Sequence, residues 1–70
     1  MNGLETRLLA AHAAGDKSAL VTLYEEAAAG AETPEAQGFF LTQAYVYALE
    51  IGHAKASTLH QRLKASGREA

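Results

Sequence analysis

The sequence predicts an all-α fold of four antiparallel helices in one domain that covers residues 1–70. Runs of good helix formers end in glycine four times, at Gly15, Gly30, Gly52 and Gly67. Glycine takes the left-handed conformation that ends many helices without steric cost. No run of residues alternates apolar and polar positions as a strand would. We therefore expect helices near 3–14, 16–29, 34–51 and 53–66, arranged as helical hairpins or a small bundle.

Cap-forming residues precede the first two predicted helices, 3–14 and 16–29. Asn2 and Glu5 have the spacing of a capping box, and the carboxylate of Asp16 can cap the second helix. In the first helix the apolar stripe is Leu4, Leu8 and Ala11, with Leu9 beside it. In the second helix the apolar residues follow the helical period at Leu20, Leu23, Tyr24, Ala27 and Ala28. Each helix should bury one face.

The third predicted helix, 34–51, begins at Thr33 followed by Pro34, a strong start signal. It is apolar nearly all round, so it should be central or should contact a partner on its second face. Four aromatic residues crowd it at different angles and are the predicted partner-binding residues: Phe39, Phe40, Tyr45 and Tyr47. Aromatic side chains that keep one end exposed to solvent are favoured at protein interfaces. The alternative is that the other three helices cover them.

The fourth predicted helix, 53–66, starts at His53, a poor capping residue, and has a narrow apolar stripe at Ala56, Leu59 and Leu63. A second line of residues shares another face and forms a predicted basic face: His53, Ser57, His60, Lys64 and Arg68. This face could meet phosphates or an acidic partner surface. The alternative is a solvated end face, with cations placed favourably near a helix C-terminus.

Composition indicates a thin core and a tendency to associate. Many apolar residues are alanine, which buries little area in the core of a 70-residue chain. The chain contains no cysteine, so disulfide bonds cannot stabilise that core. Charge is also uneven. Residues 1–52 hold two basic and seven acidic residues, whereas residues 53–70 hold four basic and one acidic. We expect head-to-tail attraction or a basic contact surface, and a homodimer is one outcome.

Several function classes are disfavoured by the residues present. His53 and His60 lie seven residues apart, about 10 Å along a helix, too far to share one metal ion. There is no cysteine nucleophile, no glycine elbow around a serine and no phosphate-binding glycine loop, so we expect no enzyme and no cofactor. The net negative charge of the chain disfavours binding to nucleic acid, because it repels the phosphates. We see no signal peptide or membrane span and expect a cytoplasmic protein.

An internal repeat of 37 residues relates the two halves of the chain. Gly15 lies 37 residues before Gly52 and Gly30 lies 37 before Gly67, and four more identities share this offset. The segments "AGDKSALVTLYEEAAAG" (14–30) and "AYVYALEIGHAKASTL" (44–59) resemble the tetratricopeptide-like superfamily, especially its Sel-like branch. That resemblance implies helical hairpins that serve as a scaffold for protein–protein contact, and it carries no catalytic residues.

The sequence thus predicts a non-enzymatic interaction module or small adaptor that associates with itself or docks a partner helix through its aromatic third helix. The alternative is a small regulator that binds nucleic acid or an acidic partner through the basic fourth helix.

Overall fold

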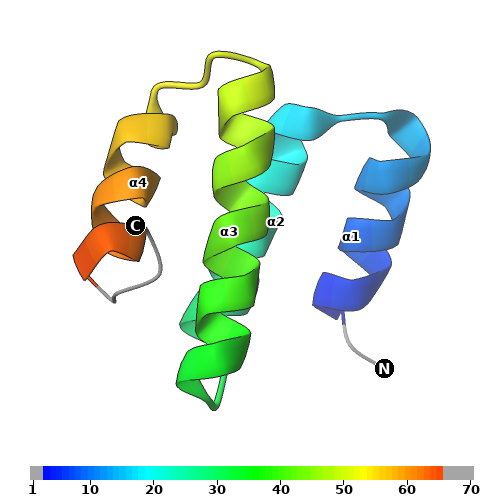
Figure 1. The fold of residues 1–70 in the computed structure, drawn as a ribbon. Coiled ribbons are helices and arrows are strands. Elements are labelled where there is room, and N and C mark those ends of the chain that lie inside the picture. Colours follow the sequence, from blue (N-terminus) through cyan, green and yellow to red (C-terminus); the bar gives the residue numbers. More distant parts are fainter. Residues whose placement is uncertain (1–2, 66–70) are drawn as a thin grey trace.

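A computed structural model describes residues 3–65, and these residues form four α-helices joined by short turns (Figure 1). The helices are α1 (Gly3–Ala14), α2 (Lys17–Ala29), α3 (Pro34–Glu50) and α4 (Lys55–Ala65). The all-α prediction is confirmed, and the helix ends that fall within residues 3–65 lie within two residues of their expected positions. The expected end of the fourth helix at residue 66 lies outside the described residues.

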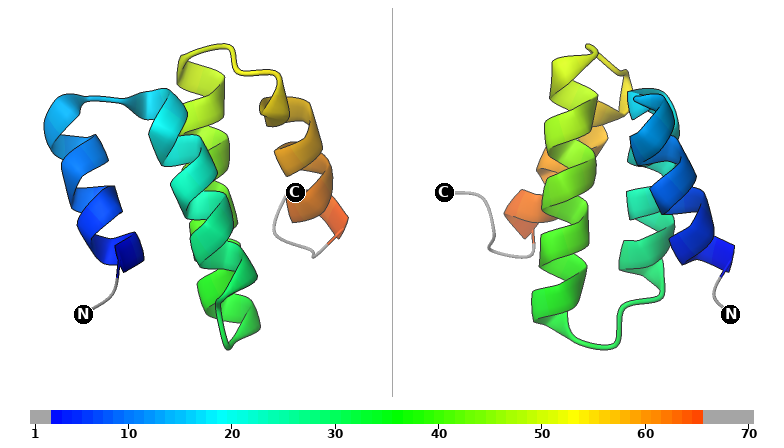
Figure 2. Two further views of the ribbon diagram at one scale, coloured as in Figure 1. Left: turned by 180° about the vertical axis from the view of Figure 1, so that it is seen from behind. Right: turned by 90° about the vertical axis from the view of Figure 1, so that its right-hand side faces the viewer.

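The four helices form a thin slab of two layers. The α1–α2 hairpin makes one layer and the α3–α4 hairpin the other, as the edge-on view shows (Figure 2, right). The Cα atoms span 32 × 29 × 13 Å. Along the chain each helix packs against the next one, and α2 and α3 make the most extensive contact. This places α3 across the front of the molecule in Figure 1, with α2 behind it.

Side-chain caps fix the starts of α2 and α3 as the sequence predicted. A carboxylate oxygen of Asp16 accepts a hydrogen bond from the N–H of Ala19 at 3.1 Å. The hydroxyl of Thr33 accepts one from the N–H of Ala36, also at 3.1 Å, and Pro34 follows at the first helical position. Each cap satisfies one of the amide groups that a helix leaves without a partner. The predicted cap Asn2 lies outside the described residues.

The two hairpin turns are built alike, one full repeat apart. Each ends its first helix with a glycine in the left-handed region, Gly15 at φ +68° and Gly52 at φ +63°. In the first turn the N–H of Asp16 donates to the carbonyl of Ala11 at 3.0 Å. In the second turn the N–H of His53 donates to the carbonyl of Ala48 at 2.8 Å. This six-residue bond is typical of a Schellman cap, so the 37-residue repeat extends to backbone hydrogen bonding.

Gly30 does not take the left-handed conformation that the sequence predicted. Its φ is −93°, and its N–H donates to the carbonyl of Glu26 at 3.1 Å. The chain leaves α2 through a short link to Thr33 rather than through a Schellman turn, so no positive φ is needed there. Its repeat partner Gly67 lies outside the described residues.

The core consists of two adjoining clusters. The larger joins three helices through Val21, Ala28, Leu41, Ala44, Ala48, Leu59 and Leu63, and the smaller joins α1 to α2 through Ala11, Leu20 and Leu23. The contact between α2 and α3 uses mainly small residues: Ala28, Ala44 and Ala48 are all buried, as is Gly38. Small side chains let two helix axes approach closely, which explains why an alanine-rich chain forms a packed core.

Candidate interaction surfaces

Three large apolar side chains lie exposed in one line along the front of α3. The exposed fraction is 57% for Phe39, 41% for Val46 and 55% for Leu49. We call these three residues the outer face of α3. At about 100° per residue they fall within one sector of the helix, spaced i, i+7 and i+10. Ile51, just past the end of α3, is also 41% exposed, but the helical period places it on a different side of the helix.

The outer face is exposed because α3 buries its opposite side. The buried side of α3 packs against α2 and α4 and includes Leu41, Ala44 and Ala48, whose exposed fractions are 3% or less. The helical period places Phe39 and Val46 on the far side of α3 from these residues. A single large exposed apolar residue is ordinary at a protein surface, whereas an aligned set is typical of contact sites.

Two of the four predicted partner-binding residues lie inside the chain's own aromatic cluster. Tyr47 stacks on Tyr24 with ring centroids 6.0 Å apart and an interplanar angle of 10°. Phe40 also stacks on Tyr24, with ring centroids 6.2 Å apart. Both are half-buried, and both join α3 to α2. Their contacts within the chain make them structural residues of the bundle.

His12 completes the aromatic cluster from α1. Its ring lies edge-on to Tyr24 and to Tyr47, with centroids 6.0 Å away in each case. The Nε2 atom of His12 is 3.0 Å from the hydroxyl oxygen of Tyr24, a hydrogen-bond distance. Burial is the main cause that raises the pKa of the Tyr24 phenol, and the nearby Tyr47 raises it further. The cluster therefore holds a neutral phenol at the junction of three helices.

The other two predicted partner-binding residues differ in exposure. Tyr45 is half-buried and stacks on His60 of α4, with ring centroids 5.6 Å apart. Phe39 is the one of the four that is mainly exposed, and it packs edge-on against Phe40 at 5.5 Å. The structure thus leaves Phe39 on the outer face. It adds Val46 and Leu49, which the sequence reasoning did not single out although their spacing from Phe39 is helical.

The predicted basic face of α4 is partly taken up by contacts within the chain. The Nδ1 atom of His53 accepts a hydrogen bond from the N–H of Lys55 at 3.0 Å and so caps the helix. His60 is half-buried against Tyr45, whereas Lys64 is exposed. Arg68, the last residue of this predicted face, lies outside the described residues. The two histidines therefore have structural roles in the fold.

Two other cations of α4 face α2, an arrangement that the sequence reasoning missed. The Nζ atom of Lys55 lies 2.8 Å from one carboxylate oxygen of Glu25, and Nη1 of Arg62 lies 3.8 Å from the other. The Glu25 side chain is 19% exposed. These ion pairs connect the two layers, and part of the basic charge of α4 is neutralised by α2.

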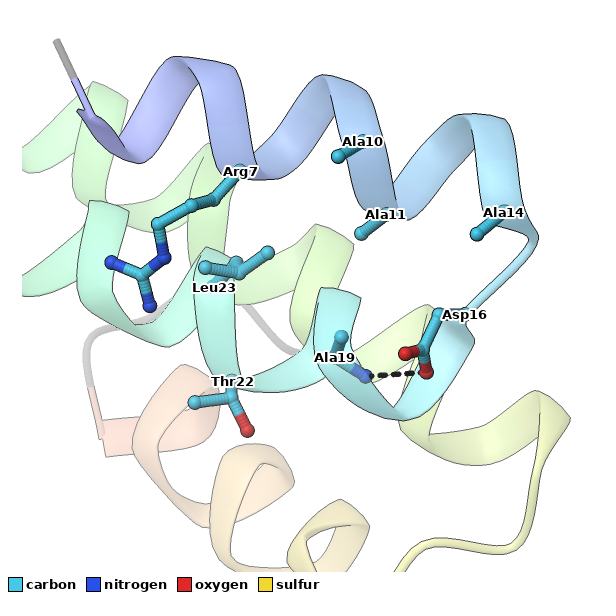
Figure 3. A pocket seen from close by; sticks show the side chains of 8 residues that line it. All are labelled: Arg7, Ala10, Ala11, Ala14, Asp16, Ala19, Thr22 and Leu23. Atoms are coloured by element: carbon cyan, nitrogen blue, oxygen red, sulfur yellow. Dashed lines mark hydrogen bonds between the residues drawn. The ribbon is translucent and has the colours of Figure 1, made fainter.

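An open groove of about 540 Å³ runs between α1 and α2 on the side away from α3 (Figure 3). Half of its lining residues are alanine: the lining consists of Arg7, Ala10, Ala11, Ala14, Asp16, Ala19, Thr22 and Leu23. The two charged groups already have partners, because Asp16 caps α2 and Arg7 pairs with Glu26 at 3.1 Å. Apart from the hydroxyl of Thr22, the polar side chains of the groove thus already have partners within the chain, and they offer little to orient a small ligand.

Within residues 3–65 no three histidine, aspartate or glutamate side chains gather closely enough to bind a metal ion. None of the four helices described is long and apolar enough to cross a bilayer.

The fold and these surfaces define a small all-α protein built from two stacked helical hairpins, with an apolar line on its front helix. Comparison of the chain with protein-family models, with curated proteins and with solved structures finds no match.

Proposed function

We propose that this chain is a non-enzymatic protein-interaction module whose contact surface is the outer face of α3. The observation that carries the proposal is the alignment of Phe39, Val46 and Leu49, each more than two-fifths exposed. Covering a large apolar side chain completely contributes roughly 1.5–3 kcal/mol. A partner that covers three of them gains a substantial part of the free energy that a specific complex requires.

The spacing of the outer face fits a helical or flat apolar partner. Anchors at i, i+7 and i+10 line one side of a helix, which is how amphipathic helices pack against each other. The resemblance to tetratricopeptide-like hairpins supports the same function, since those arrays usually bind peptides or partner domains. Phe39 is the expected main anchor, because aromatic residues dominate the energetics of interfaces.

Site-specific photo-crosslinking in living cells tests the proposal. A photoreactive phenylalanine analogue is placed at position 39, and the same analogue at Ser18, an exposed residue of α2, is the control. We expect protein adducts from position 39 that exceed those from position 18. Leu49→Lys should remove these adducts while the helical circular dichroism spectrum is retained. Equal labelling from both positions, or adducts insensitive to Leu49→Lys, would contradict the proposed surface.

A further inference from the structure

Four of the exposed residues of α3 form a nearly symmetrical series about the level of Ala44. Phe39 and Leu49, which are large, lie five residues on either side of it, and Thr42 and Val46 lie two residues on either side. All four are exposed, and all four share one sector of the helix. A surface of this kind is complementary to itself when a second helix runs antiparallel across it. Phe39 of each copy then meets Leu49 of the other, and Thr42 meets Val46.

Charge at the two ends of the outer face favours the same arrangement. Glu35 is exposed at the start of α3. At the other end of α3 the Nζ atom of Lys17 lies 2.8 Å from Glu50, so one cation and one carboxylate form an ion pair there. An antiparallel copy keeps the two Glu35 carboxylates at opposite ends and brings each of them toward an ion pair of the other copy. A parallel copy would instead place the two Glu35 carboxylates together, which is unfavourable.

We propose that the partner of the outer face is a second copy of this chain, bound about a two-fold axis that passes the level of Ala44 with the two α3 helices antiparallel. The inference rests on the proposed function, because it names the occupant of the same surface. Two-fold contacts are isologous, so residue pairs occur twice and a self-complementary line suffices. Because the slab is only 13 Å thick, no helix of the described chain covers the outer face of α3, and a second copy would cover it.

Charge-exchange variants test the pairing of position 39 with position 49. Sedimentation velocity on the wild-type chain, from about 1 to 200 μM, should show a monomer–dimer equilibrium. Phe39→Lys alone and Leu49→Glu alone should each weaken the dimer at least tenfold, because a charge then faces an apolar residue. The double variant Phe39→Lys/Leu49→Glu should recover most of the association, since the new lysine of each copy faces the new glutamate of the other. Leu9→Lys on α1, which is also highly exposed, should leave association unchanged.

A disulfide test reports the geometry independently. The chain contains no cysteine, so introduced thiols are the only ones present. The double variant Phe39→Cys/Leu49→Cys should form a covalent dimer on mild oxidation. Phe39→Cys alone should not, because the two copies of position 39 lie about 15 Å apart along antiparallel helices. Efficient linkage of the single variant would overturn the antiparallel arrangement.

The outcomes separate this inference from the proposed function. A wild-type chain that stays monomeric to 200 μM, or a double variant that fails to recover association, overturns the two-fold dimer. If position 39 nevertheless crosslinks to a different protein, the interaction module stands and only the identity of the occupant is wrong. If no adduct forms at position 39, both proposals are wrong. Circular dichroism on each variant confirms that the helices are intact.

Discussion

The carboxylate of Glu25 on α2 lies 2.8 Å from the ammonium nitrogen of Lys55 on α4, although 30 residues separate them in sequence. Arg62 approaches the same carboxylate at 3.8 Å. Because the Glu25 side chain is mostly covered, Glu25→Gln should lower the free energy of unfolding by about 1 kcal/mol. Urea denaturation followed by circular dichroism measures this change.

Its neighbour Glu26 provides the matched control. Glu26 pairs with Arg7 at 3.1 Å, but both side chains are about half exposed. Glu26→Gln should therefore change the free energy of unfolding by no more than about 0.5 kcal/mol. If Glu26→Gln proves as costly as Glu25→Gln, burial is not what gives the Glu25 contact its value.

The glycines at helix ends should respond differently to the same substitution. Gly52 has φ +63°, and a Cβ atom there would meet no neighbour within 4 Å, so the cost of Gly52→Ala is backbone strain alone. We expect a loss of about 1–2 kcal/mol. Gly30 has an ordinary negative φ, and its Cβ would lie 3.8 Å from the Glu26 carbonyl oxygen. Gly30→Ala should be neutral or stabilise by up to about 1 kcal/mol, chiefly by restricting the unfolded chain. Thermal melts of the two variants compare these effects, and a stabilised Gly52→Ala would refute the explanation.

The close contact of α2 with α3 should not tolerate a larger side chain. Ala44 has an exposed fraction of 0% and lies in the larger core cluster. Ala44→Leu should lower the free energy of unfolding by about 1–3 kcal/mol, because the helices must separate or strain to accept it. Ala29, exposed on α2, is the control, and Ala29→Leu should change stability by less than about 0.5 kcal/mol. Guanidinium unfolding curves give both values, and a tolerated Ala44→Leu would show that the contact is looser than described.

Stability should fall at alkaline pH through Tyr24. Burial and the neighbouring Tyr47 raise its pKa in the folded chain above the ordinary tyrosine value. The folded state therefore holds the phenol proton more tightly than the unfolded state does. The stabilisation is complete below the ordinary tyrosine pKa and is lost as pH rises through the higher folded-state pKa. Melting temperatures measured from pH 8 upward should decline more steeply for wild type than for Tyr24→Phe. Identical profiles would mean that Tyr24 does not contribute.

Local signals in the sequence were sufficient to place the helices. Asp16 and Thr33–Pro34 mark helix starts, and Gly15 and Gly52 mark helix stops, through bonds that involve only nearby residues. Gly30 misled the prediction because a glycine that follows a helix does not by itself select a turn type. The neighbouring segments decide that, here through the short link to Thr33.

The contact surface was harder to predict, because it depends on how each helix is rotated within the bundle. The sequence marked four aromatic residues of α3 as equals, yet Phe40 and Tyr47 turn toward Tyr24 while Phe39 turns outward. Only the positions of α2 and α4 distinguish them. The same reason hid the pairing of Glu25 with α4, since charge along one helix does not reveal which cations a neighbouring helix presents.

The matching turns after Ala11 and Ala48 have a consequence for how the chain could be lengthened by insertion. Each turn closes with a backbone bond of the same pattern, so the segment between them is a complete structural period of 37 residues. In repeat proteins each added unit contacts only its neighbours, and the stability is approximately a sum of nearest-neighbour terms. Inserting a second copy of residues 15–51 after Ile51 would preserve both turns, and α3 would then be followed by a second α2, the helix that α1 contacts now. The 37-residue period thus predicts the position at which the chain can be lengthened without loss of either turn.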